Sequence, residues 1–366
     1  MLNRFGMAQP RPVRWRDRAN PEPEDRMDAH RTPDSDCAEG GAAHVSRIHA
    51  ATADYLRELT VHRFASTPLP RQHPEVIAAL AGGKHLRARA FIATALAYGA
   101  RDERLLREVA AAIELIHTAS LVHDDILDDS SLRRGVPALH AATSTGTAVL
   151  VGDSLVALAF EAAVGRAGEV TAALARAFGE LCLGQLSEPE LGWANDALPA
   201  LERYGALKTG ALFGAALECG GIVAGRPPAE CAMLRTAGVR LGLAFQLEDD
   251  LLDVQGDAAA LGKDHGADLR NGIPTYPLWL AYRALTADRA GEVAITPGEL
   301  AATANSAWIA DRTAQRVATL VSEARATVPQ PAHARLLEIA IQTVVPATVP
   351  PTPHPTETLP DGSETP

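Results

Sequence analysis

Two clusters of aspartate residues carry the clearest chemical pattern in this sequence. Each has the form D-D-x-x-D, and the six aspartates are Asp124, Asp125, Asp128, Asp249, Asp250 and Asp253. On a helix, the first and last aspartates of such a motif share one face, where like charges destabilise the helix unless cations lie beside them. Carboxylate oxygens suit Mg²⁺, which also binds substrate phosphate oxygens. Two such motifs therefore predict a site for several magnesium ions and a polyphosphate.

Basic residues at predicted helix breaks fit the same polyphosphate. They lie near glycines and near the acidic motifs, and they are Lys84, Arg87, Arg133, Arg134, Lys208 and Lys263. Arginine is suited to bidentate phosphate contacts and lysine to point-charge contacts. A single residue of this kind is more often a solvated surface charge, but their shared placement favours a phosphate site.

Most of the chain has the apolar periodicity of helices, and these helices must position the acidic and basic residues. Apolar side chains recur at helical spacing over residues 46–65, 86–98, 103–128, 147–165, 170–186, 200–223, 229–254, 274–286, 299–304 and 309–324. Strand-like alternation is nearly absent, and the breaks are short. We therefore expect an all-α fold, a single antiparallel helical bundle with a central active-site cavity. Each acidic motif ends a strongly apolar helix, which places it at the rim of the bundle interior.

The two ends of the chain differ from this body. Residues 1–45 are rich in Pro, Arg, Asp and Glu without periodicity, and residues 345–366 repeat Pro and Thr, so both segments are expected to be disordered. Between them, residues 46–344 form one expected domain, because no long Pro/Gly-rich linker divides them.

Composition excludes several classes of protein. Of the 366 residues, 47% are apolar and only 4% aromatic, which favours packed helices over a sheet. The net charge of −11 argues against a general nucleic-acid binder. Four cysteines without a C-x-x-C pair favour a reduced, cytoplasmic setting. Asp153 and Glu161 interrupt the apolar run 147–165, so no transmembrane segment is expected.

The motifs, in their order along the chain, resemble the trans-isoprenyl diphosphate synthases, the polyprenyl synthetase family. The resemblance runs from about Leu59 to about Val345 and rests on GGKHLR, ELIHTASLVHDDILDDSSLRRGVPALH, KTG at 208–210, FQLEDDLLD and GKDHGADLRNGIPTYP. It implies the isoprenoid synthase bundle, a homodimer, and magnesium-dependent head-to-tail condensation of isopentenyl diphosphate with an allylic diphosphate.

The resemblance also implies roles for single residues. Magnesium, three ions per active site, would be held by Asp124, Asp128 and Asp249, with support from Asp125, Asp250 and Asp253. The allylic diphosphate would be contacted by Arg133, Lys208 and Lys263. The isopentenyl diphosphate would be bound by Lys84, Arg87, His117 and Arg134. The allylic carbocation would be stabilised by Thr209 and Gln246, which with Lys208 make up the catalytic group.

The sequence departs from the family pattern at three places. GGKHLRA stands where GGKRxRP is usual, but it keeps both phosphate-binding positions, Lys84 and Arg87. Gly272-Ile273-Pro274-Thr275 stands where the family commonly has G-K-x-T, so one lysine contact to the allylic diphosphate is lost. The Pro/Thr-rich C-terminus has no counterpart to the basic residues that cap the active site in some short-chain members.

Other classes fit less well. A carboxylate-bridged di-iron bundle needs two Glu-x-x-His motifs, whereas the body has one, from Glu114 to His117. A glycosidase needs two lone acids rather than two triplets. A terpene synthase on the same bundle keeps one D-D-x-x-D and lacks the GGK and Arg-Arg-Gly segments. A non-catalytic partner subunit would lose the aspartates, and both triplets are intact here.

Two small residues one turn before the first motif bear on product length. Ala119 and Ser120 share the helix face of the aspartates. In short-chain family members this place is often filled by aromatic side chains that stop chain growth. Here it is open, which predicts a medium- or long-chain synthase with a product longer than twenty carbons. Geranylgeranyl diphosphate synthase is the alternative, and close helix packing is the alternative role for the two small residues.

Overall fold

Helices make up nearly all regular structure in the computed structural model, which describes residues 33–164, 168–194, 196–256, 267–287 and 295–346. The longer helices are α1 (Pro33–Phe64), α4 (Leu86–Ala97), α5 (Glu103–Leu127), α7 (Thr145–Val164), α8 (Gly168–Ser187), α10 (Ala211–Val223), α11 (Pro228–Gln255), α14 (Tyr276–Ala287), α16 (Ala307–Thr327) and α17 (Ala334–Val344). The shorter ones are α2 (Leu69–Gln72), α3 (Pro74–Leu80), α6 (Leu139–Ala142), η1 (Glu188–Glu190), α9 (Leu198–Gly205), η2 (Ala206–Gly210), α13 (Ala267–Asn271) and α15 (Pro297–Ala304). The predicted all-α class is confirmed.

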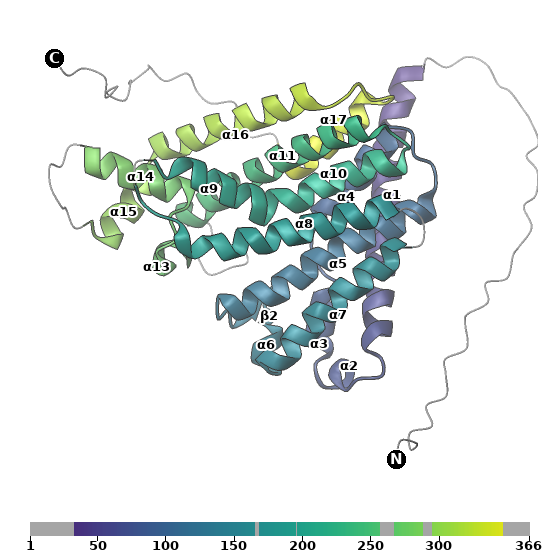
Figure 1. Cartoon of the computed structure of the whole chain (residues 1–366), viewed down its shortest axis with the longest axis horizontal. Helices are drawn as coiled ribbons and strands as arrows, with labels where there is room; N and C mark the ends of the chain where they lie inside the picture. The colour runs from purple at the N-terminus through teal and green to yellow at the C-terminus, as the bar shows by residue number, and fades with distance from the viewer. Residues whose placement is uncertain (1–32, 165–167, 195, 257–266, 288–294, 347–366) are drawn as a thin grey trace, which may run out of the picture.

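The long helices form one bundle. Helices α8, α10, α11 and α16 lie side by side in a common general direction, whereas α1 crosses them steeply (Figure 1). A short antiparallel hairpin of β1 (Leu132–Arg133) and β2 (Val136–Pro137) follows α5, with Leu132 opposite Pro137. This hairpin is absent from the sequence-based prediction, because two-residue strands carry no periodic pattern.

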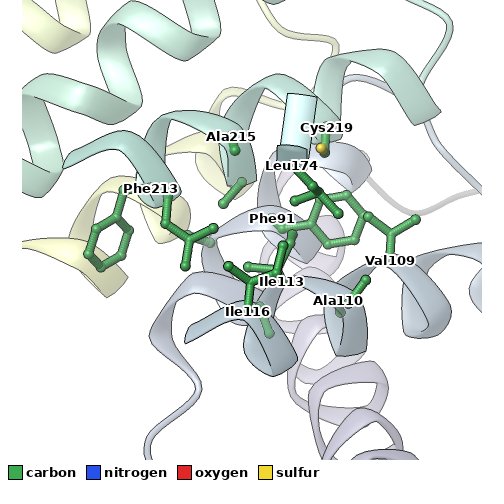
Figure 2. Close-up of a cluster of buried hydrophobic side chains, with 14 of the residues drawn as sticks. Phe91, Val109, Ala110, Ile113, Ile116, Leu174, Phe213, Ala215 and Cys219 are labelled. Carbon is green, nitrogen blue, oxygen red and sulfur yellow. The ribbon is translucent and has the colours of Figure 1, made fainter. Parts of the chain in front are cut away.

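The core lies where α4, α5, α8 and α10 meet. Phe91, Ile113, Leu174 and Phe213 come from these four helices, and each is fully buried (Figure 2). Alanine fills most of the remaining space in α4 and α5, which lets these helices approach closely. The core thereby fixes the relative positions of α5 and α10, which both lead to the acidic and basic residues singled out above.

The helical body begins earlier than expected. Helix α1 begins at Pro33, well before residue 46, and Val45 and Ile48 are buried against the core. Proline at the first helical position suits this start, because its missing N–H would have no partner there. Residues 1–32 and 347–366, which include most of the expected disordered leader and nearly all of the expected tail, lie outside the described residues.

Two helical stretches are long and apolar enough to cross a membrane by length and composition alone. They are Thr145–Ala163, which is 39% buried, and Leu198–Val223, which is 67% buried. Burial within the bundle accounts for the composition of the second stretch. The first stretch, in α7, packs on α5 but leaves apolar side chains exposed on its outer face.

Candidate active site

Both acidic motifs lie at the carboxyl ends of long helices. Asp128 caps the end of α5, where its backbone N–H donates to the Asp124 carbonyl at 2.8 Å, and Asp253 lies in the last turn of α11. Aspartate is unfavourable there, because the helix dipole already places partial negative charge at a carboxyl end. Cations beside these carboxylates would therefore stabilise both helix ends, as they would in a metal-binding site.

The middle aspartate of each motif is engaged within the protein. Asp125 is 3% exposed and accepts a 2.8 Å hydrogen bond from Arg133 Nε, while Asp250 is 7% exposed and accepts a 2.6 Å bond from Gln246 Nε2. A buried carboxylate needs such partners. The same division in both motifs supports the supporting role that the family resemblance implies for Asp125 and Asp250.

Burial shapes the electrostatics of the first motif. It raises the pKa of Asp124 to about 6, although the Lys208 ammonium acts in the opposite direction, and Asp128 adds further repulsion. The pKa of Asp128 is raised as well, also mainly by burial. The positive charge nearby does not compensate these carboxylates fully, so an added cation would stabilise their ionised forms.

The donor set fits magnesium completed by a substrate. Among the described residues, no three His, Cys, Asp or Glu side chains are grouped closely enough to hold a metal ion by themselves. Mg²⁺ is usually bound by one or two carboxylates, with waters and substrate phosphate oxygens in the other positions. Nearby, Glu248 adds a partly buried carboxylate whose buried Oε1 has no hydrogen-bond partner, and burial raises its pKa to about 7.

A basic cluster gathers around His117 on α5. Burial lowers the pKa of His117 well below its ordinary value, and the positive charges of Arg87, Arg134 and Arg133 lower it further. The structure therefore brings Arg87, Arg133 and Arg134, which the sequence placed at two separate helix breaks, together around His117. With a neutral imidazole among three guanidinium groups, the cluster is suited to a multiply charged anion.

The glycine pair before Lys84 is shaped by Arg134. The Arg134 guanidinium donates to the carbonyl of Ala79 at 2.8 Å and to the carbonyl of Gly82. Gly83 has φ +127°, and a Cβ there would lie 2.7 Å from Arg134 Nη2. A side chain at this position is therefore excluded by both conformation and space. Lys84 follows in the same loop and is exposed.

Arg87 connects the basic cluster to the second acidic motif. Its guanidinium lies 4.4 Å from the centre of the Phe213 ring, and its Nε is buried without a hydrogen-bond partner. Burial lowers the pKa of Arg87 to about 10, although the charges of Glu114 and Asp249 act in the opposite direction. A buried guanidinium with an unpaired donor is costly, so a phosphate oxygen is a suitable missing partner.

A π-helical turn carries the Lys208-Thr209-Gly210 segment. This turn, η2, interrupts an otherwise continuous helix from α9 to α10. Thr209 Oγ1 donates to Gln246 Oε1 at 2.5 Å, and Gln246 in turn donates to Asp250. Turns of this type often mark functional sites, because they redirect side chains within a helix. Thr209 and Gln246, two members of the catalytic group that the resemblance implies, are therefore linked by hydrogen bonds to the second motif.

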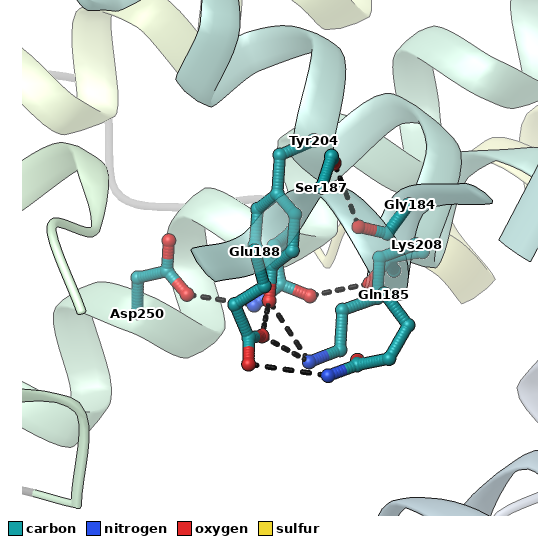
Figure 3. A network of polar contacts seen from close by, with 9 residues as sticks. Gly184, Gln185, Ser187, Glu188, Tyr204, Lys208 and Asp250 are labelled. Atoms are coloured by element: carbon teal, nitrogen blue, oxygen red, sulfur yellow. Dashed lines mark hydrogen bonds and ion pairs between the residues drawn. The ribbon is translucent and has the colours of Figure 1, made fainter. Parts of the chain in front are cut away.

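Two residues of this site were missed by the sequence analysis. Glu188 Oε2 and the Tyr204 hydroxyl each accept a hydrogen bond from Lys208 Nζ at 2.8 Å (Figure 3). Glu188 also follows a long apolar helix, which is the signal that identified the aspartate motifs. As a single acid in the segment Ser187-Glu188-Pro189-Glu190, it could not be distinguished from a solvated helix end.

The remaining predicted residues have different outcomes. Lys263 lies outside the described residues. Ala119 and Ser120 are 0% and 5% exposed, and Ser120 Oγ donates to the His117 carbonyl at 2.8 Å. Two pockets flank the acidic motifs, one bordered by Gln246 and Asp250 and the other by Asp125 and Arg133, and neither is lined by Ala119 or Ser120.

Comparison with known protein families identifies the family to which the chain belongs. The polyprenyl synthetase family model matches residues 73–301, which is more than half of the chain. The chain belongs to the polyprenyl synthetase family. As a member of this family it is a trans-prenyl diphosphate synthase and therefore a prenyltransferase.

Relatives whose names give different product lengths match this synthase about equally well. It is 39% identical over 232 residues to a farnesyl diphosphate synthase of Escherichia coli, covering 58% of this chain and 77% of that protein. It is 39% identical over 201 residues to an octaprenyl diphosphate synthase of the same organism, covering 54% of this chain and 61% of the relative. The chain thus spans less than two thirds of the octaprenyl enzyme.

Solved structures match the fold of this synthase over a larger share of its length than the sequence relatives do. A polyprenyl synthase from Caulobacter crescentus matches with a TM-score of 0.70 and 33% identity, covering 82% of this chain and 96% of that one. A decaprenyl diphosphate synthase from Rhodobacter capsulatus matches with a TM-score of 0.69 and 31% identity, covering 84% and 98%. The all-α isoprenoid synthase fold is thereby confirmed.

Proposed function

We propose that this protein is a magnesium-dependent all-trans polyprenyl diphosphate synthase that adds isopentenyl diphosphate to an allylic diphosphate. The observation that carries the proposal is that the two D-D-x-x-D motifs, at the ends of α5 and α11, are linked through shared cations. Lys208 and Arg133 act on Asp124, Asp249 acts on Arg87, and both Arg87 and Arg133 act on His117. Two acidic motifs and two groups of cations match two diphosphate substrates.

The acidic motifs would hold the metal. Asp124, Asp128 and Asp249 are the proposed ligands of up to three Mg²⁺ ions. When bound, magnesium supplies positive charge that stabilises the leaving diphosphate. Asp125 and Asp250 keep the helix ends in place through Arg133 and Gln246.

The two diphosphates would bind on different groups of cations. Lys208 and Arg133, with Lys263, are proposed to contact the allylic diphosphate, because Lys208 lies within the electrostatic reach of Asp124 and Asp128. Arg87, Arg134 and His117, with Lys84, are proposed to bind the isopentenyl diphosphate. In this division the allylic carbon lies between the two groups, within reach of the isopentenyl double bond.

Ionisation of the allylic carbon–oxygen bond produces a carbocation and a diphosphate anion. The side-chain oxygens of Thr209 and Gln246 are proposed to stabilise the cation, and the apolar walls of the bundle exclude water from it. The isopentenyl double bond then attacks the cation, and a proton leaves the adduct. The departing diphosphate is the proposed proton acceptor.

Product length and assembly are further parts of the proposal. The small side chains of Ala119 and Ser120 support a product longer than twenty carbons, with a twenty-carbon product as the second candidate.

Leu150 of α7 and Leu186 of α8 are 70% and 73% exposed, and exposed apolar surface of this kind supports a homodimer. Cys182, Cys219 and Cys231 are free thiols, which supports a cytoplasmic location.

The test is turnover of radiolabelled isopentenyl diphosphate with each allylic starter, with magnesium or with a chelator. Asp124→Asn and Asp249→Asn should each lower kcat by on the order of 10² or more, because each removes a carboxylate ligand of the Mg²⁺ that stabilises the charge developing on the diphosphate. Asp129→Asn is the matched control, since Asp129 lies in the same acidic run but outside the motif. Activity near wild type in both motif variants, or no need for a divalent cation, would contradict the proposal.

A further inference from the structure

Lys208 is held by two side chains that come from different elements. Its Nζ donates to Glu188 Oε2 in η1 and to the Tyr204 hydroxyl in α9, both at 2.8 Å. The Tyr204 hydroxyl donates its own proton to Glu188 Oε2, and Gln185 Nε2 donates to Glu188 Oε1 at 3.1 Å. All four polar groups converge on one point in Figure 3. We name Glu188 and Tyr204 the Glu188–Tyr204 pair.

The pair holds the ammonium group beside the first acidic motif. Burial acts to lower the pKa of Lys208, but its hydrogen bond to Glu188 and the charges of Glu188, Asp124 and Asp128 raise it. The ammonium therefore has Glu188 and Tyr204 as direct partners and also feels the field of the two proposed metal ligands. The Lys208 side chain is 24% exposed and that of Glu188 is 16% exposed, so water screens this arrangement only in part.

The phenol suits the bridging role. Burial and the Glu188 carboxylate both raise the pKa of Tyr204 above its ordinary value, so the hydroxyl stays protonated and can donate to Glu188 while accepting from Lys208. The long lysine side chain loses rotamer entropy when its position is fixed. Partners that fix it in the unliganded enzyme reduce the entropy that substrate binding would otherwise cost.

On the same wall of the site, the position of Ile273 supplies no positive charge. Tyr204 lines a pocket together with Gln246, Asp250 and Ile273. Ile273 stands where the family commonly has a lysine, and an isoleucine supplies no charge to a diphosphate. Binding of the allylic diphosphate therefore depends more strongly on where the Lys208 ammonium is held.

We propose that Tyr204 is a positioning residue of this enzyme: together with Glu188 it fixes the Lys208 ammonium where the allylic diphosphate binds. The inference rests on the proposed function, in which Lys208 contacts that diphosphate. It concerns a hydroxyl group four residues before Lys208, which the π-helical turn and α9 bring to the same point.

The first test is Tyr204→Phe, which keeps the ring and removes the bridging hydroxyl. We expect the KM for the allylic diphosphate to rise by about tenfold, which is the effect of losing one hydrogen bond to a charged group. The KM for isopentenyl diphosphate should stay unchanged. Calorimetric binding of farnesyl thiodiphosphate, which cannot ionise readily, should weaken by the same factor. Unchanged affinity for both allylic ligands overturns the proposal.

Tyr98→Phe is the matched control. The Tyr98 hydroxyl donates to the Pro329 carbonyl at 2.6 Å, in a part-buried contact between α4 and the segment before α17. Its loss should lower Tm and leave both KM values unchanged. If Tyr98→Phe raises the allylic KM as much as Tyr204→Phe does, the effect is one of general stability and the proposal is overturned.

A double-mutant cycle separates positioning from other effects. If Tyr204 acts through Lys208, Tyr204→Phe lowers kcat/KM for the allylic substrate in the wild type but not in a Lys208→Ala background. Equal losses in both backgrounds overturn the positioning role while leaving the synthase function intact. A wild-type enzyme without prenyl transfer activity overturns the proposed function itself, and this result is seen before any variant is compared.

Discussion

Arg87 is the residue at which the two halves of the site meet. It contributes to the basic cluster around His117, and the charge of Asp249 in the second acidic motif acts on it. Its stacking on Phe213 satisfies the face of the guanidinium but not the buried Nε. An unpaired donor in a buried position is expected to find its partner in the substrate.

Arg87→Lys should therefore affect one substrate more than the other. A lysine keeps the charge but loses the planar fork, so we expect the KM for isopentenyl diphosphate to rise by about tenfold or more and the allylic KM to change less. Lys208→Ala should show the reverse order in the same steady-state assay. Arg89→Lys, exposed on the same helix, is the control. Equal changes for both substrates would show that the cations are not divided between the diphosphates.

Glu248 makes the stability of the metal-free enzyme depend on pH, in a direction that follows from its raised pKa. Burial raises its pKa to about 7 from an ordinary value of 4.5, so the folded state binds more protons than the unfolded state between these pH values. Stability therefore falls as pH rises through this window. Glu248→Gln, measured with chelator present, should raise Tm by about 3 °C at pH 8, after discounting for partial exposure, and have no effect near pH 4.5.

The exposed Glu58→Gln is the control for this measurement, and its effect on Tm should be the same at both pH values. A Glu248→Gln variant that gains the same Tm at pH 4.5 and pH 8 would mean that ionisation of this carboxyl is not the cause.

At the scale of elements, the contact of α10 with α11 is the closest in the site. A Cβ added at Gly238 would lie 2.5 Å from the Phe213 carbonyl oxygen, and one at Gly242 would lie 2.6 Å from the Gly210 Cα. Both neighbours are backbone atoms, which cannot move aside without shifting a helix. The segments that carry Thr209 and Gln246 are therefore held at a fixed separation.

Gly238→Ala should consequently destabilise the fold. We expect a loss of about 1–3 kcal/mol in the free energy of unfolding, measured by denaturant titration, together with a lower kcat. Gly298→Ala is the opposite case, because a Cβ at this position of α15 would meet nothing within 4 Å and alanine has the higher helix propensity. If the two variants have the same stability, close packing is not the reason for the glycine.

The long helices with a periodic apolar pattern could be predicted from the sequence. Helices α4, α5 and α11 agree with the predicted ranges, because each presents a wide apolar face and ends at a glycine, a proline or an acidic run, whereas the predicted range 200–223 takes in α9, η2 and α10. The early start of α1 could not be predicted, since the segment before residue 46 is polar and its helix depends on contact with α17. The π-helical turn has no periodic signature, and the links from Tyr204 and Glu188 to Lys208 arise only from tertiary packing.

At the scale of the whole molecule, the end of the bundle that carries the acidic motifs is separate from the apolar interior. Ala119 and Ser120 lie one turn deeper in α5 than Asp124. Ala119→Phe should give a folded, active enzyme with products shorter by one or more isoprene units, because one helical turn of about 5.4 Å is close to the length of one such unit. Product sizing by chromatography measures this, and Tm shows whether the larger side chain is tolerated. Unchanged products from a well-folded variant would place the growing chain elsewhere.

The glycines between α10 and α11 have a consequence for how such an enzyme can diverge. Gly210, Gly214, Gly238 and Gly242 would each bring a Cβ within 3.0 Å of the facing helix, so this wall tolerates almost no substitution. The wall formed by α5 has small side chains rather than missing ones at Ala119 and Ser120. If the product channel runs along α5 as proposed, selection can lengthen or shorten the product by exchanging Ala119 and Ser120 while the packing that positions Thr209 and Gln246 is inherited unchanged.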